Sequence, residues 1–166
     1  MRVYGIVGRK NTGKTHLVTR LVRAATQRGL AVATVKHAHH AFDVDQPGKD
    51  SYLHREAGAS EVIVSSALRW ALLHENRGAP EPALPELLAR LSPCDLVLVE
   101  GFKAGGHAKL EVYRASCGQP PLDSGDATVE AIAVDRATEL TTALERLPLD
   151  DTGAILEFIL HRVRLR

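Results

Sequence analysis

The sequence predicts an α/β fold in which helices flank a mostly parallel sheet and an antiparallel hairpin extends it. Three features of the chain lead to this prediction. A short apolar run at residues 3–7 enters a glycine-containing loop at residues 8–15, and apolar residues then recur at helical spacing. A second strand-like run at residues 30–36 follows, so the strands are expected to be parallel, with a right-handed crossover. A wholly apolar run at residues 96–99 is typical of a strand buried on both faces in the middle of a sheet.

The loop at residues 8–15 has the spacing G-x-x-x-x-G-K-T of a P-loop, so the fold is expected to be P-loop NTPase-like. Gly8 and Gly13 let the backbone approach a phosphate, which successive amides and the following helix attract. Lys14 is expected to reach the β- and γ-phosphates, and the Thr15 hydroxyl to bind Mg²⁺. An ordinary glycine turn is the alternative, which the flanking strand and helix argue against. The residues predicted to bind nucleotide here are Gly8, Asn11, Thr12, Gly13, Lys14 and Thr15.

The remaining elements follow from periodicity and from residues that begin or end helices. Gly29 can take the left-handed conformation that ends the helix after the P-loop. Asp50 or Ser51 can cap the second helix, and Asp151 or Thr152 the last one. In chain order, the expected elements after the first strand are a helix at 13–28, a strand at 30–36, a helix at 51–57, strands at 61–66 and 68–74, a helix at 84–91, the strand at 96–99, strands at 109–114 and 129–135, and a closing helix.

The two runs between residues 61 and 74 are expected to pair as the antiparallel hairpin. A helix is the alternative for the second run, because Leu68, Leu72 and Leu73 also fit a period of 3.6 residues. Trp70 is expected to be an anchor in the core or at a subunit contact.

Length, charge and cysteine content limit the classes of protein that fit. With 166 residues, a single nucleotide-binding domain over residues 1–166 is expected. The net charge of +1 gives no electrostatic reason to expect a nucleic acid partner. Cys94 and Cys117 do not have the CxxC spacing of a metal or redox site. No apolar run has the length of a membrane span and a strand begins close to Met1, so a cytoplasmic protein without a signal peptide is expected.

The polar segment at residues 37–51 follows the second strand, at the edge of a parallel sheet where ligands bind. Three histidines and two aspartates lie within nine residues: His37, His39, His40, Asp43 and Asp45. Three interpretations stay open. The segment could sense phosphate and Mg²⁺, with Asp45 or Asp43 near the metal and a histidine near the phosphates. It could instead hold a transition metal, which usually needs a further ligand from elsewhere, or be a solvated loop.

Two strand ends carry acids that suit a nucleotide site. Glu100 ends the apolar run at 96–99 and could hold Mg²⁺ directly or through water, or orient a water molecule. A solvent-facing carboxylate is the alternative. Gly101 then permits the close approach of a γ-phosphate. Asp135 lies where an acid could read the ring N–H and amino group of guanine, although the N-K-x-D signature of many GTPases is missing.

Together these stretches resemble the MobB family of molybdopterin-guanine dinucleotide biosynthesis adaptor proteins. The resemblance covers most of the chain, and the stretches that begin at Lys36 and at Val99 are much more specific than the P-loop alone. The matching stretches are the P-loop with Asn11-Thr12, the run from Lys36-His37 to Pro47-Gly48-Lys49-Asp50-Ser51, Arg69-Trp70-Ala71, and Val99-Glu100-Gly101-Phe102-Lys103.

The resemblance implies a cytoplasmic homodimer that binds GTP with Mg²⁺ and has at most weak GTPase activity. The implied partner is a MobA-like guanylyltransferase, which joins GMP to molybdopterin, and a molybdopterin intermediate is a further candidate ligand. Thr15, Asp45 and Glu100 are expected at the metal, with Glu100 and Asp45 as catalytic residues. His37 and Lys49, from the functional loop of the family, are expected to join Gly101 and Asp135 in binding the nucleotide.

Two other classes of function remain as alternatives. A stand-alone small kinase or NTPase would use the same P-loop, but a kinase also needs an acceptor site, a base and usually an arginine-bearing lid. The sequence shows no obvious lid, although Arg55, Arg69 and Arg77 are available. A metallochaperone NTPase would depend on the histidines at 37, 39 and 40, and would retain a stoichiometric metal ion through chelation.

Overall fold

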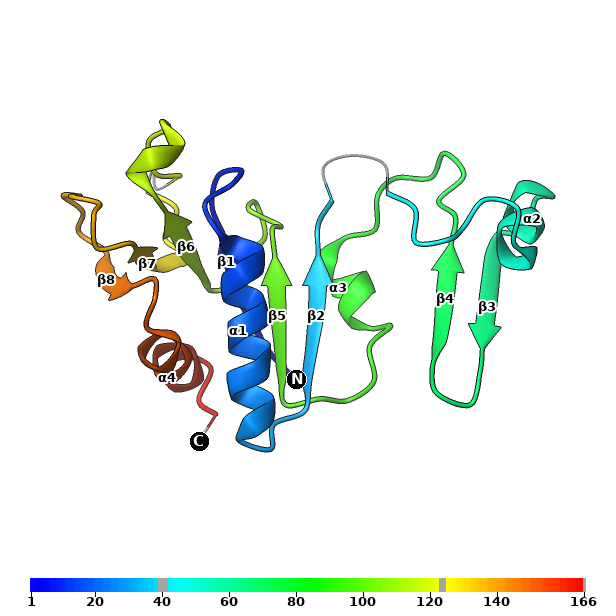
Figure 1. Cartoon of the computed structure of the whole chain (residues 1–166), viewed down its shortest axis with the longest axis horizontal. Coiled ribbons are helices and arrows are strands. Elements are labelled where there is room, and N and C mark those ends of the chain that lie inside the picture. Colours follow the sequence, from blue (N-terminus) through cyan, green and yellow to red (C-terminus); the bar gives the residue numbers. More distant parts are fainter. Residues whose placement is uncertain (39–41, 123–124, 166) are drawn as a thin grey trace. The chain divides into compact units, whose positions relative to one another are not determined.

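The computed structural model of the chain describes residues 1–38, 42–122 and 125–165 (Figure 1). The chain forms two compact units. The larger comprises Met1–His37 and Leu84–Arg166, and the smaller comprises Ala38–Ala83. That residues 1–166 act as one nucleotide-binding domain stays a prediction.

The larger unit is built on a six-stranded sheet in which every neighbouring pair of strands is parallel. The strand order is β2-β5-β1-β6-β7-β8. The strands are β1 (Arg2–Val7), β2 (Val32–Lys36), β5 (Leu96–Glu100), β6 (Lys109–Tyr113), β7 (Val129–Val134) and β8 (Glu145–Pro148). Because all of them run the same way, their carboxyl ends meet at one edge, where α/β proteins bind ligands. The predicted position of the 96–99 strand is confirmed, since β5 lies between β2 and β1.

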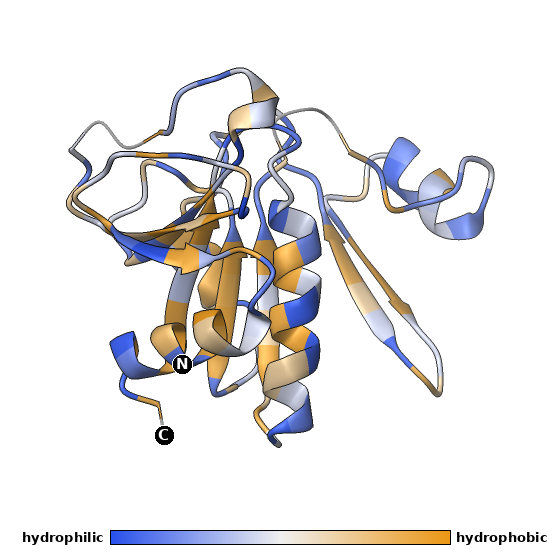
Figure 2. Ribbon diagram, turned by 60° about the vertical axis from the view of Figure 1, so that its left-hand side comes forward, coloured by the Kyte–Doolittle hydropathy of each residue, from blue (hydrophilic) through white to orange (hydrophobic). Residues whose placement is uncertain are grey.

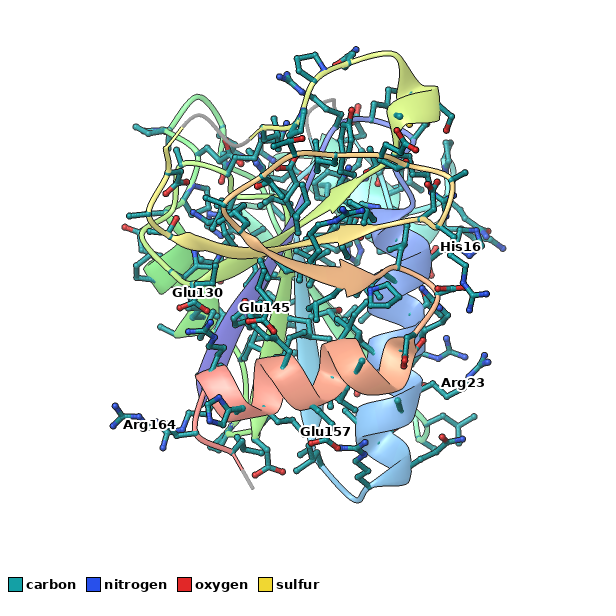
Figure 3. The ribbon with its side chains drawn as sticks, turned by 90° about the vertical axis from the view of Figure 1, so that its left-hand side faces the viewer. His16, Arg23, Glu130, Glu145, Glu157 and Arg164 are labelled. Atoms are coloured by element: carbon teal, nitrogen blue, oxygen red, sulfur yellow. The ribbon has the colours of Figure 1, made fainter. Side chains whose placement is uncertain are left out.

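Helices cover both faces of this sheet. They are α1 (Lys14–Gln27), α3 (Leu84–Leu88) and α4 (Thr152–Arg162), and a 3₁₀ turn, η1, spans Ala115–Cys117. Helices α1 and α4 lie against each other on one face (Figure 3), where Arg28 pairs with Glu157 at 2.6 Å. Asp151 caps α4 by accepting a hydrogen bond from the Ala154 amide, which confirms Asp151 as the capping residue. The predicted α/β architecture is therefore confirmed.

The core of the larger unit lies on both sides of the sheet, because successive strand residues point to opposite faces. Leu96 and Leu98 belong to the cluster that packs under α1 and α4, whereas Val97 and Val99 pack with Leu84 of α3. The central strands are accordingly mostly apolar (Figure 2). This double burial fixes the position of β5 and of the acid at its end.

Two features of the sheet differ from the expectations. Strand β8 was not predicted, because its sequence Glu-Arg-Leu-Pro alternates weakly and only Leu147 is buried. Strand β6 was expected to alternate apolar and polar positions, but Lys109 and Glu111 are as buried as their neighbours. The Lys109 ammonium is satisfied there by the carbonyl oxygens of Lys103 and Gly105 and the Thr128 hydroxyl.

The smaller unit contains α2 (Asp50–Glu56) and a hairpin of β3 (Glu61–Ser65) and β4 (Trp70–His74). The hairpin is antiparallel, with Val62 opposite Leu73, so the helical alternative for the second run is wrong. Helix α2 has no side-chain cap, because Asp50 is already helical, so the predicted cap is wrong too. Trp70 is 64% exposed, which rules out a core position for its ring. None of the helices in the described ranges is long and apolar enough to cross a membrane.

Candidate functional site

The P-loop runs from the end of β1 to the start of α1, and its backbone takes conformations that favour glycine. Gly8 and Gly13 have φ angles of +148° and +100°, and Asn11 is left-handed at +64°. A Cβ at Gly8 would collide with the carbonyl oxygen of Val112 on β6. The two glycines of the motif are therefore required by geometry, as the sequence predicts.

The Lys14 ammonium lies back on its own loop. Its Nζ donates to the carbonyl oxygen of Arg9 at 2.6 Å, and the Thr12 hydroxyl donates to the same oxygen at 3.0 Å. Burial lowers the pKa of Lys14, and the nearby cations Lys103 and Lys36 lower it further, although Glu100 opposes them. A polyphosphate offers this cation a stronger, charge-assisted partner than a neutral carbonyl.

Glu100 and Thr15 meet where β5 ends beside the P-loop helix. The Thr15 hydroxyl donates to Glu100 Oε1 at 2.8 Å, and Lys36 Nζ lies 3.2 Å from the same oxygen. Glu100 is only 9% exposed, so the alternative of a solvent-facing carboxylate is wrong. A hydroxyl and a carboxylate oxygen are the ligands that Mg²⁺ prefers, so these two residues could hold it.

Gly101 and His37 lie next to this acid, at the ends of β5 and β2. Gly101 has a φ of +96°, and a Cβ there would lie 2.9 Å from the Cβ of His37. The His37 amide donates to the Glu100 carbonyl oxygen at 2.8 Å. The His37 ring stacks on the Phe102 ring, with 4.6 Å between the ring centroids. The structure thus brings Gly101 and His37 together with Glu100. Sequence reasoning did not assign Phe102 a role, although it lies in the stretch VEGFK.

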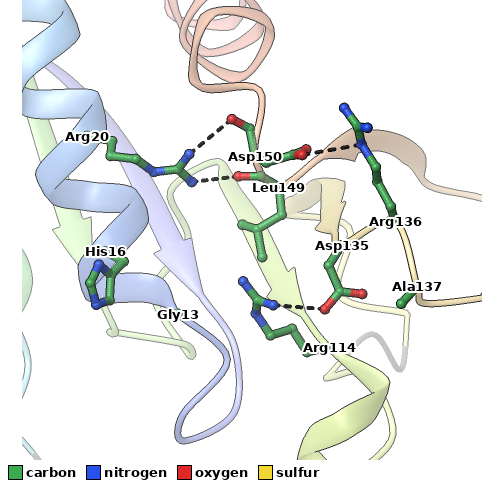
Figure 4. Close-up of a pocket in the computed structure, with 9 residues that line it drawn as sticks. All are labelled: Gly13, His16, Arg20, Arg114, Asp135, Arg136, Ala137, Leu149 and Asp150. Atoms are coloured by element: carbon green, nitrogen blue, oxygen red, sulfur yellow. Dashed lines mark hydrogen bonds and ion pairs between the residues drawn. The ribbon is translucent and has the colours of Figure 1, made fainter.

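A cavity of about 710 Å³ adjoins the P-loop on the side of β6 and β7 (Figure 4). Its lining residues are Gly13, His16, Arg20, Arg114, Asp135, Arg136, Ala137, Leu149 and Asp150. Asp135 was predicted at this edge, and Oδ2 of its carboxylate accepts from Arg114 Nη1 at 2.9 Å. The prediction missed Arg114. The same edge argument that found Asp135 applies to it, since Arg114 directly follows β6.

Asp45 and Lys49 belong to the smaller unit, in which Lys49 precedes the first turn of α2. Asp45 accepts from the Ser51 hydroxyl at 2.7 Å and from Arg55 Nε at 3.1 Å. The Ser51 hydrogen bond, helped by Arg55, lowers the pKa of Asp45. Arg55 also pairs with Asp43 and Glu75. Metal binding by Asp45 would have to compete with these bonds, and the roles of Asp45 and Lys49 at the nucleotide stay predictions.

The transition-metal interpretation depends on His39 and His40, which lie outside the described residues. Among the residues that the structure does describe, no three His, Cys, Asp or Glu side chains are grouped so that they could hold a metal ion.

The P-loop beside the central strand and the all-parallel strand order define the larger unit as a P-loop NTPase-like nucleotide-binding fold. Residues 3–135 match the MobB family, described as molybdopterin guanine dinucleotide synthesis protein B. The chain belongs to this family.

The chain is similar to individual members of this family along most of their length. The chain is 41% identical over 153 residues to the molybdopterin-guanine dinucleotide biosynthesis adapter protein of Escherichia coli, covering 90% of this chain and 86% of that protein. It is 36% identical over 158 residues to the Haemophilus influenzae protein of the same name, covering 93% and 85%. The crystal structure of a MobB homolog from Bacillus stearothermophilus matches with a TM-score of 0.70 and 28% identity, over the whole of both chains.

Proposed function

We propose that the protein is a GTP-binding adaptor in molybdopterin guanine dinucleotide biosynthesis, which assists a MobA-like guanylyltransferase and hydrolyses GTP weakly at most. The observation that carries the nucleotide-binding part is the P-loop at the carboxyl edge of the sheet. Among the described contacts, the Lys14 ammonium there is paired only with the neutral carbonyl of Arg9. The Thr15 hydroxyl and the Glu100 carboxylate lie within hydrogen-bond distance of each other. The adaptor part is supported by the names of the E. coli and H. influenzae relatives.

Guanine preference is supported by the cavity beside the P-loop. Asp135 lines it, and a carboxylate can accept hydrogen bonds from the ring N–H and the amino group of guanine, which adenine cannot supply. Mg²⁺ would bind at Thr15 and Glu100, where its positive charge would offset the negative charge of the phosphates.

Weak hydrolysis is expected because the transition state of phosphoryl transfer needs more positive charge than the P-loop lysine supplies. The guanidinium of Arg114, which lies beside the loop, is engaged by the Thr12 carbonyl and the Asp135 carboxylate. A partner protein or a second subunit is expected to supply the missing charge.

A homodimer is supported by the hairpin of the smaller unit. Its strands and turn expose large apolar side chains: Ile63, Val64, Leu68, Trp70 and Leu72. Exposed apolar clusters of this kind mark contact surfaces, and a second copy would bury Trp70 at a subunit contact, which is the alternative left for that residue.

The experiment that tests the proposal is a titration with fluorescent GTP and ATP analogues, with and without Mg²⁺ and with and without the transferase. An adaptor is expected to prefer GTP, to need Mg²⁺ for full affinity and to respond to the transferase. Equal affinity for both nucleotides together with fast hydrolysis would favour the stand-alone NTPase. A metal ion that survives chelation would favour the metallochaperone, which no described contact supports.

A further inference from the structure

The carboxylate of Asp135 is held from two sides. Its Oδ2 accepts from Arg114 Nη1 at 2.9 Å, and its Oδ1 accepts from the Thr138 hydroxyl at 2.6 Å. The Thr138 oxygen in turn accepts from the Ala115 amide at 3.1 Å, which anchors it just after β6. Each carboxylate oxygen has two lone pairs, so one on each oxygen stays available for the two N–H donors of a guanine edge.

Arg114 connects this carboxylate to the P-loop. Its Nε donates to the Thr12 carbonyl oxygen at 3.0 Å, while Nη1 of the same guanidinium reaches Asp135 (Figure 4). The group lies close to the loop, since a Cβ at Gly13 would be 3.7 Å from Arg114 Nε. A guanidinium is planar and rigid, so these two bonds set the distance and angle between the acid and the loop.

The other two arginines of the cavity make different contacts. Arg20 donates to the carbonyl oxygens of Leu149 and Asp150, and Arg136 pairs with the Asp150 carboxylate at 3.3 Å (Figure 4). Neither of them has a described contact with Asp135 or with the P-loop. Among the described contacts, Arg114 is therefore the arginine of this cavity that joins Asp135 to the P-loop.

We infer that Arg114 is a positioning residue for base recognition: it fixes Asp135 relative to the P-loop so that one nucleotide can place its base edge and its phosphates together. This inference rests on the proposed function, in which Asp135 reads guanine. Lysine cannot replace Arg114, because a single ammonium lacks the fixed fork that makes both bonds. Thr138 supports the same carboxylate by donating to Oδ1 of Asp135, and it has no described contact with the P-loop.

The test compares the binding of GTP and ITP by calorimetry. ITP differs from GTP only in lacking the amino group from which Asp135 would accept a hydrogen bond. The wild-type protein is expected to bind GTP about tenfold or more tightly than ITP, the size of one hydrogen bond to a charged group. Arg114→Lys and Thr138→Val are each expected to reduce this ratio severalfold. Arg28→Lys, at a guanidinium that pairs with Glu157 outside the cavity, is expected to keep it. A residue that only stabilises the fold would shift the unfolding temperature without changing the ratio.

Inorganic tripolyphosphate, which has no base, separates the inference from the proposed function. No binding of either GTP or tripolyphosphate by the wild-type protein would refute nucleotide binding itself. Equal binding of GTP and ITP would remove Asp135 and Arg114 from base recognition but leave the phosphate site intact. A wild-type preference for GTP that survives Arg114→Lys in a folded protein would overturn the inference alone. If Arg114→Lys does not fold, Thr138→Val decides the outcome.

Discussion

The hydroxyl of Thr15 donates a 2.8 Å hydrogen bond to the carboxylate of Glu100, a residue 85 positions further along the chain. The bond joins the start of α1 to the end of β5, and Lys36 of β2 completes the contact at 3.2 Å from Glu100. Three neighbouring elements thus contribute to one small polar site.

Lys14→Ala is expected to weaken GTP binding about 100-fold or more, because it removes the charged donor to the phosphates. Its effect on the fold should be small, since the side chain makes one described hydrogen bond, to the Arg9 carbonyl. Calorimetry and thermal unfolding measure the two effects. Lys10→Ala, an exposed lysine in the same loop, is the control and should bind normally. Wild-type affinity in Lys14→Ala would refute the P-loop assignment.

The lowered pKa of Lys14 predicts a pH dependence of both folding and binding. Because the folded pKa lies below the ordinary 10.5, the unfolded chain binds more protons between the two values. The free energy of unfolding therefore rises with pH in that window. Phosphate binding favours the charged amine, so GTP affinity should fall as pH rises through the same window. Lys14→Arg stays charged and is the reference, and parallel pH profiles for the two proteins would contradict the prediction.

Glu100→Gln is expected to raise the Mg²⁺ concentration needed for GTP binding about tenfold or more, because the charged metal ligand is lost. Affinity for GTP without Mg²⁺ should be unchanged or slightly higher, since a negative charge near the phosphates disappears. Titration of Mg²⁺ at fixed nucleotide concentration measures the difference. Glu157→Gln, on the exposed side of α4, serves as the control. If the Mg²⁺ titration does not move, Glu100 is not a metal ligand.

Gly101→Ala is expected to destabilise the protein more than Gly29→Ala. Both glycines have positive φ, at +96° and +82°, so both substitutions carry the cost of a left-handed residue, about 1 kcal/mol. Only at Gly101 does the new Cβ meet another group, the Cβ of His37 at 2.9 Å, whereas Gly29 has open space. Denaturant unfolding of the two variants should separate them by about 1 kcal/mol or more. Equal midpoints would mean that the His37 contact is easily relieved.

Trp70→Ser is expected to shift the protein from dimer to monomer, because it removes the largest exposed apolar side chain of the hairpin. Sedimentation velocity over a range of protein concentrations measures the change. Leu53→Ser is the control, since Leu53 is 53% exposed on α2 of the same unit but outside the hairpin. A monomeric wild-type protein would refute the homodimer, and a variant that stays dimeric would place the interface elsewhere.

The parts of the site that the sequence predicts correctly are those fixed by strand direction. A P-loop, an acid after an apolar strand and a glycine after that acid must meet once the strands are parallel, and Thr15, Glu100 and Gly101 do meet. The same edge argument applies to Arg114, which directly follows β6. Its contacts with Thr12 and Asp135, however, depend on the conformation of a long side chain, which spacing along the chain does not encode. Strand β8 was missed because pairing with β7, not its own pattern, makes it a strand.

The role predicted for Asp45 in the smaller unit depends on contacts that the sequence does not encode. Asp45 is close in sequence to His37, but the structure shows that its nearest charged partner is Arg55, ten residues later on α2. A carboxylate in a polar loop looks the same in sequence whether it binds a metal or an arginine. Strand hydropathy likewise could not decide between a buried and an exposed Trp70, since both occur in apolar hairpins.

The Arg9 carbonyl oxygen accepts hydrogen bonds from both Lys14 and Thr12, so the lysine of the P-loop has a partner within its own loop. Any incoming anion must first displace that internal partner. A ligand with one phosphate regains little in exchange, whereas a chain of three regains several contacts at once. The P-loop is therefore expected to discriminate between nucleotides by phosphate number, and to bind GTP in preference to GMP.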